Sequence, residues 1–261
     1  MLLFYEPSTR TRHSFELACK ALGADSVSLA AASSAVAKGE SLADTVRTAR
    51  ALGADAVVLR HPASGAARCA AALNLLPVIN AGDGTHAHPT QALLDLFTVR
   101  QRRGGLEGLR LTIVGDILHS RVARSSALAF ARTGARVTLC GPPTVLPPAA
   151  GTALGAHVCH DLATALRGAE AVMALRIQQE RQDGGLLPSA AEYRARWGLD
   201  AARLAAECPT AILLHPGPVN RGVELAPDLL DLPQSAVEAQ VRAGVAVRMA
   251  VLYLLLGGEA A

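Results

Sequence analysis

The sequence predicts an α/β fold of two tandem open parallel sheets flanked by helices, with a C-terminal helix packing back on the first domain. Short β-like runs alternate with longer helical runs, which is typical of parallel strands joined by helices. A second series of such runs begins at Leu111, just after the polar, glycine-containing segment 100–108. With 261 residues, 51% of them hydrophobic, the chain is large enough to bury the cores of two lobes.

The first series of elements opens with a loop and a helix at EPSTRTRHSFELACKALG. In this segment Phe15, Cys19 and Leu22 have helical spacing, and a glycine follows as the expected end of the helix. Strands are then expected at DSVSL, DAVVLR and PVINAG. The helices that follow them are expected to begin near Leu42, Ser64 and Pro89.

The second series supplies the second sheet. Its expected strands are LTIVGD, ARVTLCGP, AHVC, AVMALR and AILLHPGP. Its helices are expected to begin near Ser120, Leu146, Asp161, Ala190 and Asp200. A last helix, from about Ser235 to Leu256, has an apolar face. We therefore expect a first domain at 1–100, to which segment 235–261 returns, and a second domain at 101–234.

Composition and charge limit the classes of partner. The 25 basic and 22 acidic residues give a small net charge of +3, which argues against nucleic acid and anionic membranes and favours small-molecule partners. The N-terminus has no basic region ahead of an apolar stretch, so it does not resemble a signal peptide. No apolar run reaches the length of about 18 residues that a membrane span needs. These features predict a soluble, cytoplasmic protein.

The cysteines favour reduced thiols over disulfides. There are five, they are widely spaced, and no C-x-x-C pair occurs. The close group His157, Cys159 and His160 lacks a second cluster at ligand spacing, so no metal site is predicted. No G-x-G-x-x-G motif follows the strand at Leu111, which removes the usual sign of a dinucleotide. We expect no cofactor.

The segment STRTR, at the start of the first helix, points to anion binding. Arg10 and Arg12 fall in the first turn, where the helix dipole is already positive, so they disfavour the helix until an anion is bound. The hydroxyls of Ser8, Thr9 and Thr11, together with backbone N–H groups and an arginine, are typical of a phosphate cradle. The alternative is an ordinary Ser or Thr N-cap with exposed arginines.

Three further segments of the first lobe add hydrogen-bond donors. Arg60 in RHP follows a strand and would bring a second cation to the same crevice, unless it is a solvated arginine. In NAGDGTHAHPTQ, His88 and Gln91 lie three residues apart at a helix start, where they could donate to a carbonyl oxygen and hold an NH2 group. Lys38 lies in a loop of small residues, from which it could reach an anion in its own or a neighbour's site. The alternatives are a turn histidine and a surface lysine.

The second lobe carries polar residues beyond three expected strands. Arg121 follows LTIVGD, and Arg176 and Gln178 come at and just after the end of AVMALR. Two arginines from different strands could form bidentate pairs with two carboxylates. In HPGP, the prolines hold the backbone so that the carbonyls of Pro216 and Gly217 could accept hydrogen bonds from an amine.

Taken in order, these segments resemble the catalytic chains of the aspartate carbamoyltransferase family. The matching motifs are STRTR, KGE, RHP, NAGDG with HPTQ, GD with SR, R-x-Q-x-E-R, and HPGPVNRG ahead of GVAVRMAVL. They cover nearly the whole chain. The resemblance implies a first domain for carbamoyl phosphate, a second for L-aspartate, and a homotrimer with active sites shared between subunits. It also implies carbamoyl transfer in pyrimidine biosynthesis, without a metal or cofactor.

The resemblance implies roles for individual residues. The expected catalytic residues are Arg10, Thr11, Lys38, Arg60 and His88. Those expected to bind the phosphate are Ser8, Thr9, Arg10, Thr11 and Arg60. The carbamoyl NH2 group is expected to meet Gln91 and the carbonyls of Pro216 and Gly217. Ser34 and Lys38 are expected to enter the neighbouring subunit's site, and Arg121, Arg176 and Gln178 to bind aspartate.

Two alternatives to this function differ in kind. Ornithine carbamoyltransferases are similar in the first lobe but typically carry an H-C-L-P loop, whereas this chain has HPGP together with Arg176 and Gln178. Aspartate is therefore the favoured acceptor. Family members also carry an N-terminal segment ahead of the position at which this sequence starts. We expect a misassigned start; the alternative is a truncated, non-catalytic scaffold that binds a dihydroorotase or a regulatory chain.

Overall fold

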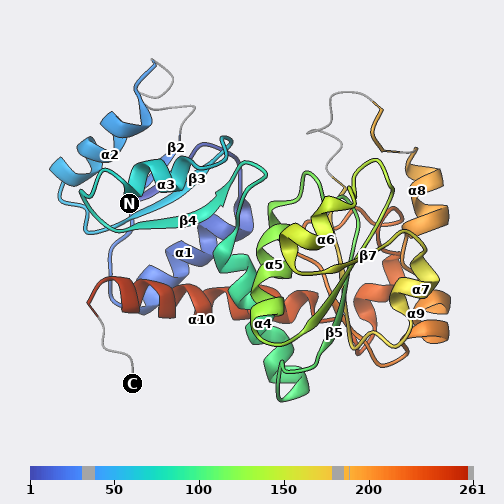
Figure 1. Ribbon diagram of the computed structural model, residues 1–261. Helices are drawn as coiled ribbons and strands as arrows, with labels where there is room; N and C mark the ends of the chain where they lie inside the picture. The colour runs from blue at the N-terminus through green and yellow to red at the C-terminus, as the bar shows by residue number, and fades with distance from the viewer. Residues whose placement is uncertain (31–38, 178–184, 188, 258–261) are drawn as a thin grey trace. The chain divides into compact units, whose positions relative to one another are not determined.

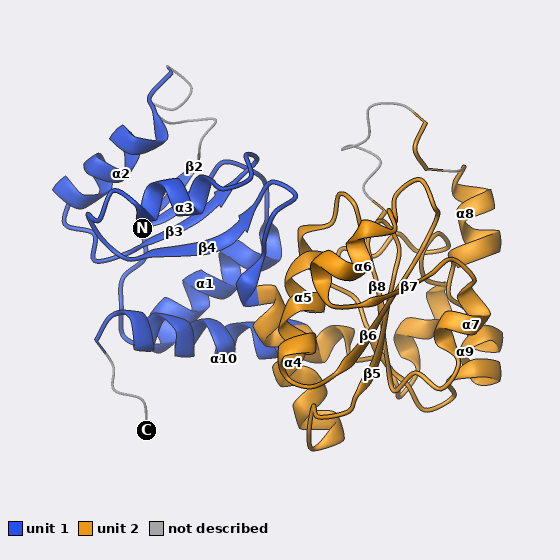
Figure 2. Ribbon diagram, in the orientation of Figure 1, with its two compact units in different colours: residues 1–90, 241–261 blue, residues 91–240 orange. Residues whose placement is uncertain are grey.

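The computed structural model describes residues 1–30, 39–177, 185–187 and 189–257 (Figure 1). The chain divides into two compact units, coloured separately in Figure 2. Unit 1 contains Met1–Thr90 and Val241–Ala261, and unit 2 contains Gln91–Gln240. Two helices contribute residues to both units: α4 (Pro89–Arg103) and α10 (Val237–Leu255).

Unit 1 is built on a four-stranded sheet of order β2-β1-β3-β4, in which every pair is parallel. The strands are β1 (Leu2–Phe4), β2 (Ser28–Ala30), β3 (Val57–His61) and β4 (Val78–Asp83). The last three confirm the strands expected from the sequence. Strand β1 was not expected, because periodicity alone cannot tell whether the short apolar run at residues 1–5 is a strand or part of a helix. Its pairing with β2 and β3 gives it that conformation.

Alternating side chains of this sheet enter two cores. Leu2 and Phe4 lie in one buried cluster with α1 (Thr9–Ala21), while Leu3 lies in the other with α2 (Leu42–Ala51) and α3 (Ala66–Ala71). Leu252 of α10 belongs to the first cluster. The expectation that the C-terminal helix packs back on the first sheet is therefore confirmed.

Unit 2 is built on a five-stranded parallel sheet of order β7-β6-β5-β8-β9. All five strands confirm the expectation. They are β5 (Arg110–Val114), β6 (Arg136–Cys140), β7 (His157–Cys159), β8 (Ala171–Ala174) and β9 (Ile212–Leu214).

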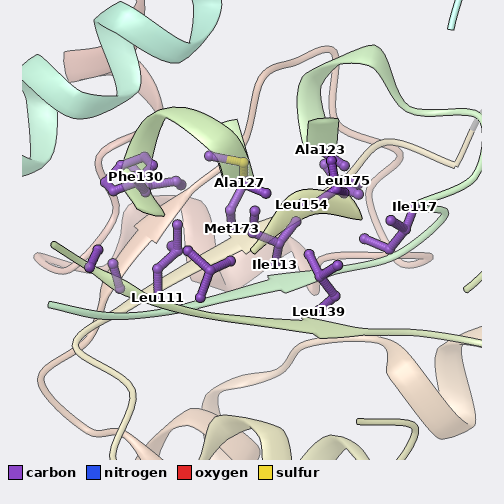
Figure 3. Close-up of a cluster of buried hydrophobic side chains, with 14 of the residues drawn as sticks. Leu111, Ile113, Ile117, Ala123, Ala127, Phe130, Leu139, Leu154, Met173 and Leu175 are labelled. Atoms are coloured by element: carbon purple, nitrogen blue, oxygen red, sulfur yellow. The ribbon is translucent and has the colours of Figure 1, made fainter. Parts of the chain in front are cut away.

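Helices cover both faces of this second sheet. Figure 3 shows the cluster on one face, where Ile113 of β5 and Met173 of β8 meet Phe130 of α5 (Arg121–Arg132). Val114 follows Ile113 in β5, and Val172 precedes Met173 in β8. Both valines lie in the cluster on the opposite face. That cluster is completed by α7 (Leu162–Leu166), α8 (Ala190–Trp197) and α9 (Ala201–Glu207). Successive side chains of each strand thus point to opposite faces of the sheet, and both faces are buried.

Side-chain caps explain where several of the helices begin. The side chains of Ser41, Ser120, Asp161 and Asp200 each accept a backbone N–H three residues on, and the helices begin where the sequence indicates. The expected start near Leu146 is wrong: α6 spans Ala149–Leu154. Two prolines follow Leu146, and a residue before proline is driven out of the helical region. A 3-10 turn, η4 (Pro227–Asp231), precedes α10.

The cysteines form no disulfides, and three of the five are buried. All five cysteines lie in described residues and are free, as expected. Burial raises the pKa of Cys140 to about 12 and that of Cys208 to about 11, so both remain neutral thiols.

The loop after β4 is organised by the buried carboxylate of Asp83. Its oxygens accept hydrogen bonds from the backbone N–H of Gly65 at 2.6 Å, from the Asn80 side-chain amide at 2.8 Å and from the backbone N–H of Ala87 at 3.1 Å. The loop also passes close to another segment, because a Cβ on Gly84 would lie 2.5 Å from the backbone nitrogen of Ser64. The tight, close-approach loop expected from NAGDG is confirmed.

Hydrogen bonding and burial act in opposite directions on Asp83. Burial raises the pKa of its carboxyl, but hydrogen bonds from Asn80, His86 and Gly65 outweigh burial, and the net pKa is lowered. A carboxyl whose pKa is lower in the folded than in the unfolded state stabilises the fold above its unfolded pKa. That stabilisation is lost as the pH falls through the folded pKa.

Replacing Asp83 with Asn is predicted to lower the free energy of unfolding at pH 7 by about 1.5–3 kcal/mol, because charged hydrogen bonds from partly buried donors are lost. The gap between wild type and D83N should then close as the pH falls through the folded pKa. Urea denaturation of both proteins from pH 7 to pH 3 measures this gap. The exposed Asp25, changed to Asn, is the matched control. Equal stability of D83N and wild type at pH 7 would contradict the assignment.

Candidate active site

The STRTR residues lie where the first strand of unit 1 leads into a helix. Ser8 occupies the N-cap of α1, and Thr9, Arg10 and Thr11 form its first turn. Unlike Ser41 and the other capping residues, Ser8 accepts no hydrogen bond from the helix through its side chain. The first N–H groups of a helix have no acceptor within it. This helix start therefore presents backbone donors, hydroxyls and a guanidinium, which suits a bound anion better than an ordinary cap.

Arg60 lies at the same edge of the sheet. Because β1 and β3 are parallel neighbours, Phe4 lies opposite Arg60, and the N–H of Tyr5 donates to the Arg60 carbonyl at 2.9 Å. The Arg60 side chain is 14% exposed, and its Nε lies 3.5 Å from Oε2 of Glu6. Its Nη1 donates to the carbonyl of Ala81 at 3.4 Å. Arg60 is therefore held in place beside the start of α1.

The next residue fixes the turn that follows β3. His61 Nδ1 accepts a hydrogen bond from the N–H of Ala63 at 2.9 Å, and its ring lies 4.7 Å from that of Tyr5. Burial lowers the pKa of His61, which favours the neutral, accepting ring. The RHP motif thus places the cationic Arg60 next to the neutral His61, whose ring holds the turn after β3.

His88 reaches this edge through the Asp83 loop. His61 pairs with Asp83 across β3 and β4, and the N–H of Gly84 donates to the carbonyl of His61 at 2.9 Å. Four residues after Gly84, His88 is buried and immediately precedes α4. The carboxyl ends of β1, β3 and β4 therefore place the Ser8–Thr11 turn, Arg60 and His88 on one edge of one sheet.

In unit 2, the expected site residues follow three neighbouring strands. Arg121 is buried and begins α5 after β5, Arg176 lies two residues beyond β8, and Pro216 lies two residues beyond β9. The Asn220 side-chain amide donates to the carbonyl of Ile177 at 3.0 Å, which joins the loops after β8 and β9. Because these strands are parallel, their following loops share the carboxyl edge of the sheet.

The HPGP turn is held by a buried, hydrogen-bonded pair, His215 and Glu224. His215 Nδ1 accepts from the N–H of Gly217 at 2.8 Å, so the ring proton lies on Nε2, which is 3.1 Å from Oε1 of Glu224. Both side chains are at most 1% exposed. The same Glu224 oxygen accepts from the N–H of Asn220 at 2.6 Å. These contacts fix the backbone that carries the carbonyls of Pro216 and Gly217.

Gln91 is buried in the first turn of α4, and its amide nitrogen donates to Oδ1 of Asp95 at 2.8 Å. Among the expected site residues, Ser34, Lys38 and Gln178 lie outside the described part of the chain. The others are divided between the two units. Those of unit 1, at the carboxyl edge of its sheet, are Ser8, Thr9, Arg10, Thr11, Arg60 and His88. Those of unit 2 that follow strands of its sheet are Arg121, Arg176, Pro216 and Gly217, whereas Gln91 lies in α4, which follows β4.

The sequence interpretation missed the buried acids that support these groups. Asp83, Asp95 and Glu224 are each at most 1% exposed. The signal for Asp83 was its place between two glycines, where a side chain can bond to its own loop. Asp95 and Glu224 had no such local signal.

Across the described residues, no three histidine, cysteine, aspartate or glutamate side chains gather in a way that could hold a metal ion. His160, considered above with Cys159, instead has its Nδ1 at 3.0 Å from the carbonyl of Gly141. No helix in the described ranges has the length and apolar character that a bilayer span requires.

Comparisons with known proteins identify the family of the chain. Residues 1–101 match the family model described as aspartate/ornithine carbamoyltransferase, carbamoyl-P binding domain. Residues 107–255 match the model described as aspartate/ornithine carbamoyltransferase, Asp/Orn binding domain. The chain is 58% identical over 256 residues to an aspartate carbamoyltransferase catalytic subunit of Pelotomaculum thermopropionicum, covering 98% of this chain and 82% of that one. A catalytic subunit from Salinispora arenicola is 55% identical over 259 residues, covering 98% and 84%.

Solved structures give the same result. Aspartate transcarbamoylase from Trypanosoma cruzi, in complex with carbamoyl phosphate and aspartate, superposes with a TM-score of 0.89 at 31% identity, covering 98% of this chain and 84% of that one. Ornithine carbamoyltransferase from Pyrococcus furiosus gives 0.86 at 28% identity, covering 99% and 84%. Matching domain models over both halves, close relatives and a shared fold lead to one conclusion: the chain belongs to the aspartate/ornithine carbamoyltransferase family.

Proposed function

We propose that the chain transfers the carbamoyl group of carbamoyl phosphate to the amino group of L-aspartate, giving N-carbamoyl-L-aspartate and phosphate. The observation that carries this proposal is the gathering of cationic and N–H donors at the carboxyl edges of two parallel sheets. Relatives at 53–58% identity are aspartate carbamoyltransferase catalytic subunits, which supports aspartate as the acceptor. In this proposal residues 1–100, with 235–261, bind carbamoyl phosphate, and residues 101–234 bind aspartate.

The residues of unit 1 suit a phosphate ester with a carbonyl group. The start of α1, with Ser8, Thr9 and Arg10, would hold the phosphate together with Arg60. Thr11, Arg60 and His88 would donate to the carbonyl oxygen. Attack by the aspartate amine makes the carbamoyl carbon tetrahedral and places negative charge on that oxygen, where these donors stabilise it.

The residues of unit 2 suit an acceptor with two carboxylates. Arg121 and Arg176, together with Gln178, would each bind a carboxylate and so hold the amine beside the carbamoyl carbon. As the tetrahedral state collapses, the bond to the phosphate oxygen breaks, and phosphate leaves. The departing phosphate is well placed to accept the proton that the amine loses. The chain's part is to position two anions and to stabilise developing charge.

The assembly and setting belong to the same proposal. We propose a homotrimer in which Ser34 and Lys38 enter the neighbouring subunit's site, and in which a dihydroorotase or a regulatory chain can bind as a further partner. The reaction belongs to pyrimidine biosynthesis, which we place in the cytoplasm.

The direct test is an assay with two acceptors. Carbamoyl phosphate and the purified chain are incubated with either L-aspartate or L-ornithine, and the carbamoylated product of each is measured. We expect turnover with aspartate and at most about 1% of that kcat/KM with ornithine, because a site that places two guanidinium groups rejects a cationic side chain. Turnover of ornithine alone would overturn the proposed acceptor, and turnover of neither would count against the reaction.

Replacing Arg60 with Ala is predicted to lower kcat by about 10²–10³-fold, because it removes a charged donor facing the developing oxyanion. The control is Arg68→Ala, which removes an exposed arginine of the same unit and should leave kcat unchanged. Steady-state rates for carbamoyl aspartate formation decide the outcome. A kcat for R60A within about threefold of wild type would rule out this role.

Mixing two inactive variants tests whether sites are shared. Chains carrying Lys38→Ala and chains carrying Arg60→Ala are combined in equal amounts, unfolded and refolded together. If Lys38 serves the neighbour's site, random trimers should regain about a quarter of wild-type activity, because one site in four then has both residues intact. A mixture of Arg60→Ala and His88→Ala chains is the control and should stay inactive, since both residues serve the same chain's site. Recovery in neither mixture would refute sharing.

A further inference from the structure

A buried polar network in unit 2 surrounds Asp95, on the second turn of α4. Its side chain is 0% exposed. Oδ1 accepts hydrogen bonds from the side-chain amides of Gln91 at 2.8 Å and Gln240 at 2.7 Å, and Oδ2 accepts one from the Ser126 hydroxyl at 3.0 Å. Hydrogen bonds from several donors favour the ionised carboxylate. An ionised carboxylate only accepts hydrogen bonds, so both amides must turn their NH2 groups toward it.

The orientation of Gln240 supports this reading independently. With its NH2 group on Asp95, its Oε1 accepts a hydrogen bond from the backbone N–H of His215 at 2.9 Å. A backbone N–H can only donate, so the Gln240 amide is correctly oriented at both ends. By the same logic, Gln91 turns its Oε1 away from Asp95 and offers an acceptor.

The network continues from His215 to the HPGP turn. The ring of His215 accepts from the N–H of Gly217 at 2.8 Å and meets Glu224 at 3.1 Å. Glu224 in turn accepts from the N–H of Asn220 at 2.6 Å. One buried carboxylate thus lies at the branch point between the Gln91 amide and the turn that carries the carbonyls of Pro216 and Gly217.

We propose that Asp95 is a positioning residue that makes the site select an NH2 group on the donor substrate. It does so by orienting Gln91 Oε1 as an acceptor and by anchoring, through Gln240, the turn bearing two further carbonyl acceptors. A group with two N–H donors can form hydrogen bonds with these three acceptors and bind more tightly. A methyl group of the same size cannot, and it would leave the acceptors without partners. This inference rests on the proposed function, since it assigns those acceptors to carbamoyl phosphate.

The test uses two unreactive ligands of nearly equal size. Phosphonoacetamide and acetonylphosphonate share a phosphonate and a carbonyl group, and differ only in carrying NH2 or CH3. Each is titrated into the full chain by calorimetry, and each is measured as a competitive inhibitor against carbamoyl phosphate. Wild type is expected to bind the amide more tightly than the methyl ketone.

The variant Asp95→Asn offers both a donor and an acceptor, so Gln91 can turn over. It should lower the preference for the amide about tenfold, mainly by weakening binding of the amide. Gln240→Met keeps the Gln91 contact but removes the link to His215, and should lower the preference about threefold. Ser126→Ala is the control: it removes a hydrogen bond to Asp95 that comes from neither amide, and should leave the preference within about twofold of wild type.

The ratio of the two affinities separates positioning from a merely structural role. If Asp95→Asn weakens both ligands by the same factor, or if wild type binds them equally, the inference is overturned. Should Asp95→Asn fail to fold, Gln240→Met decides, because an unchanged preference in that variant also overturns the inference. Carbamoyl transfer to aspartate by wild type is measured separately, so a failure of the proposed function would be recognised as such.

Discussion

Parallel pairing of the strands is the constraint on which the site depends. In each sheet all strands run the same way, so every loop that follows a strand emerges at one edge. The residues after β1, β3 and β4, which are far apart in the sequence, thereby share one edge, as do those after β5, β8 and β9. If one of these strands ran the other way, its donors would move to the opposite edge. The direction of the strands thus determines the edge of each sheet at which the site residues lie.

Collecting cations at one edge has an electrostatic cost, and neighbouring acids reduce it. Glu6 lies 3.5 Å from Arg60, and Glu16 accepts from Arg12 at 3.1 Å, one helical turn away. The contact with Glu16 distinguishes Arg12 from Arg10, although the sequence alone places both arginines in the first turn. Arg12 is directed along α1 toward Glu16, whereas Arg10 lies exposed in the first turn. An anion at the helix start would therefore meet Arg10, in keeping with its proposed role.

The features that the sequence predicted well are those written in local patterns. Strands buried on both faces, and caps such as Ser41 and Asp200, depend on neighbours within a few residues. The misplaced start of α6 also had a local cause, the prolines after Leu146, that a stricter use of the same rules would have found. Strand β1 is different, because three residues become a strand only through partners that lie well beyond them in the sequence.

The polar network could not be predicted in this way. Gln240 lies 145 residues from Asp95, and in a helical run an aspartate is normally taken for a solvated charge. The site motifs indicated which side chains we propose to meet substrate but gave no sign of what orients them. Supporting residues of this kind become visible only when the fold brings distant segments together.

The cost of burying Asp95 indicates why it is there. Removing a carboxylate from water is unfavourable, and well-packed apolar residues in place of buried charges are often neutral or stabilising. Stability alone is therefore a weak reason for a charge at this position. Orientation is a stronger one, because an amide can turn over and exchange its donor and acceptor, whereas a carboxylate that only accepts permits one of the two orientations. A buried acid beside Gln91 gives the site a fixed pattern of acceptors that an apolar neighbour could not impose.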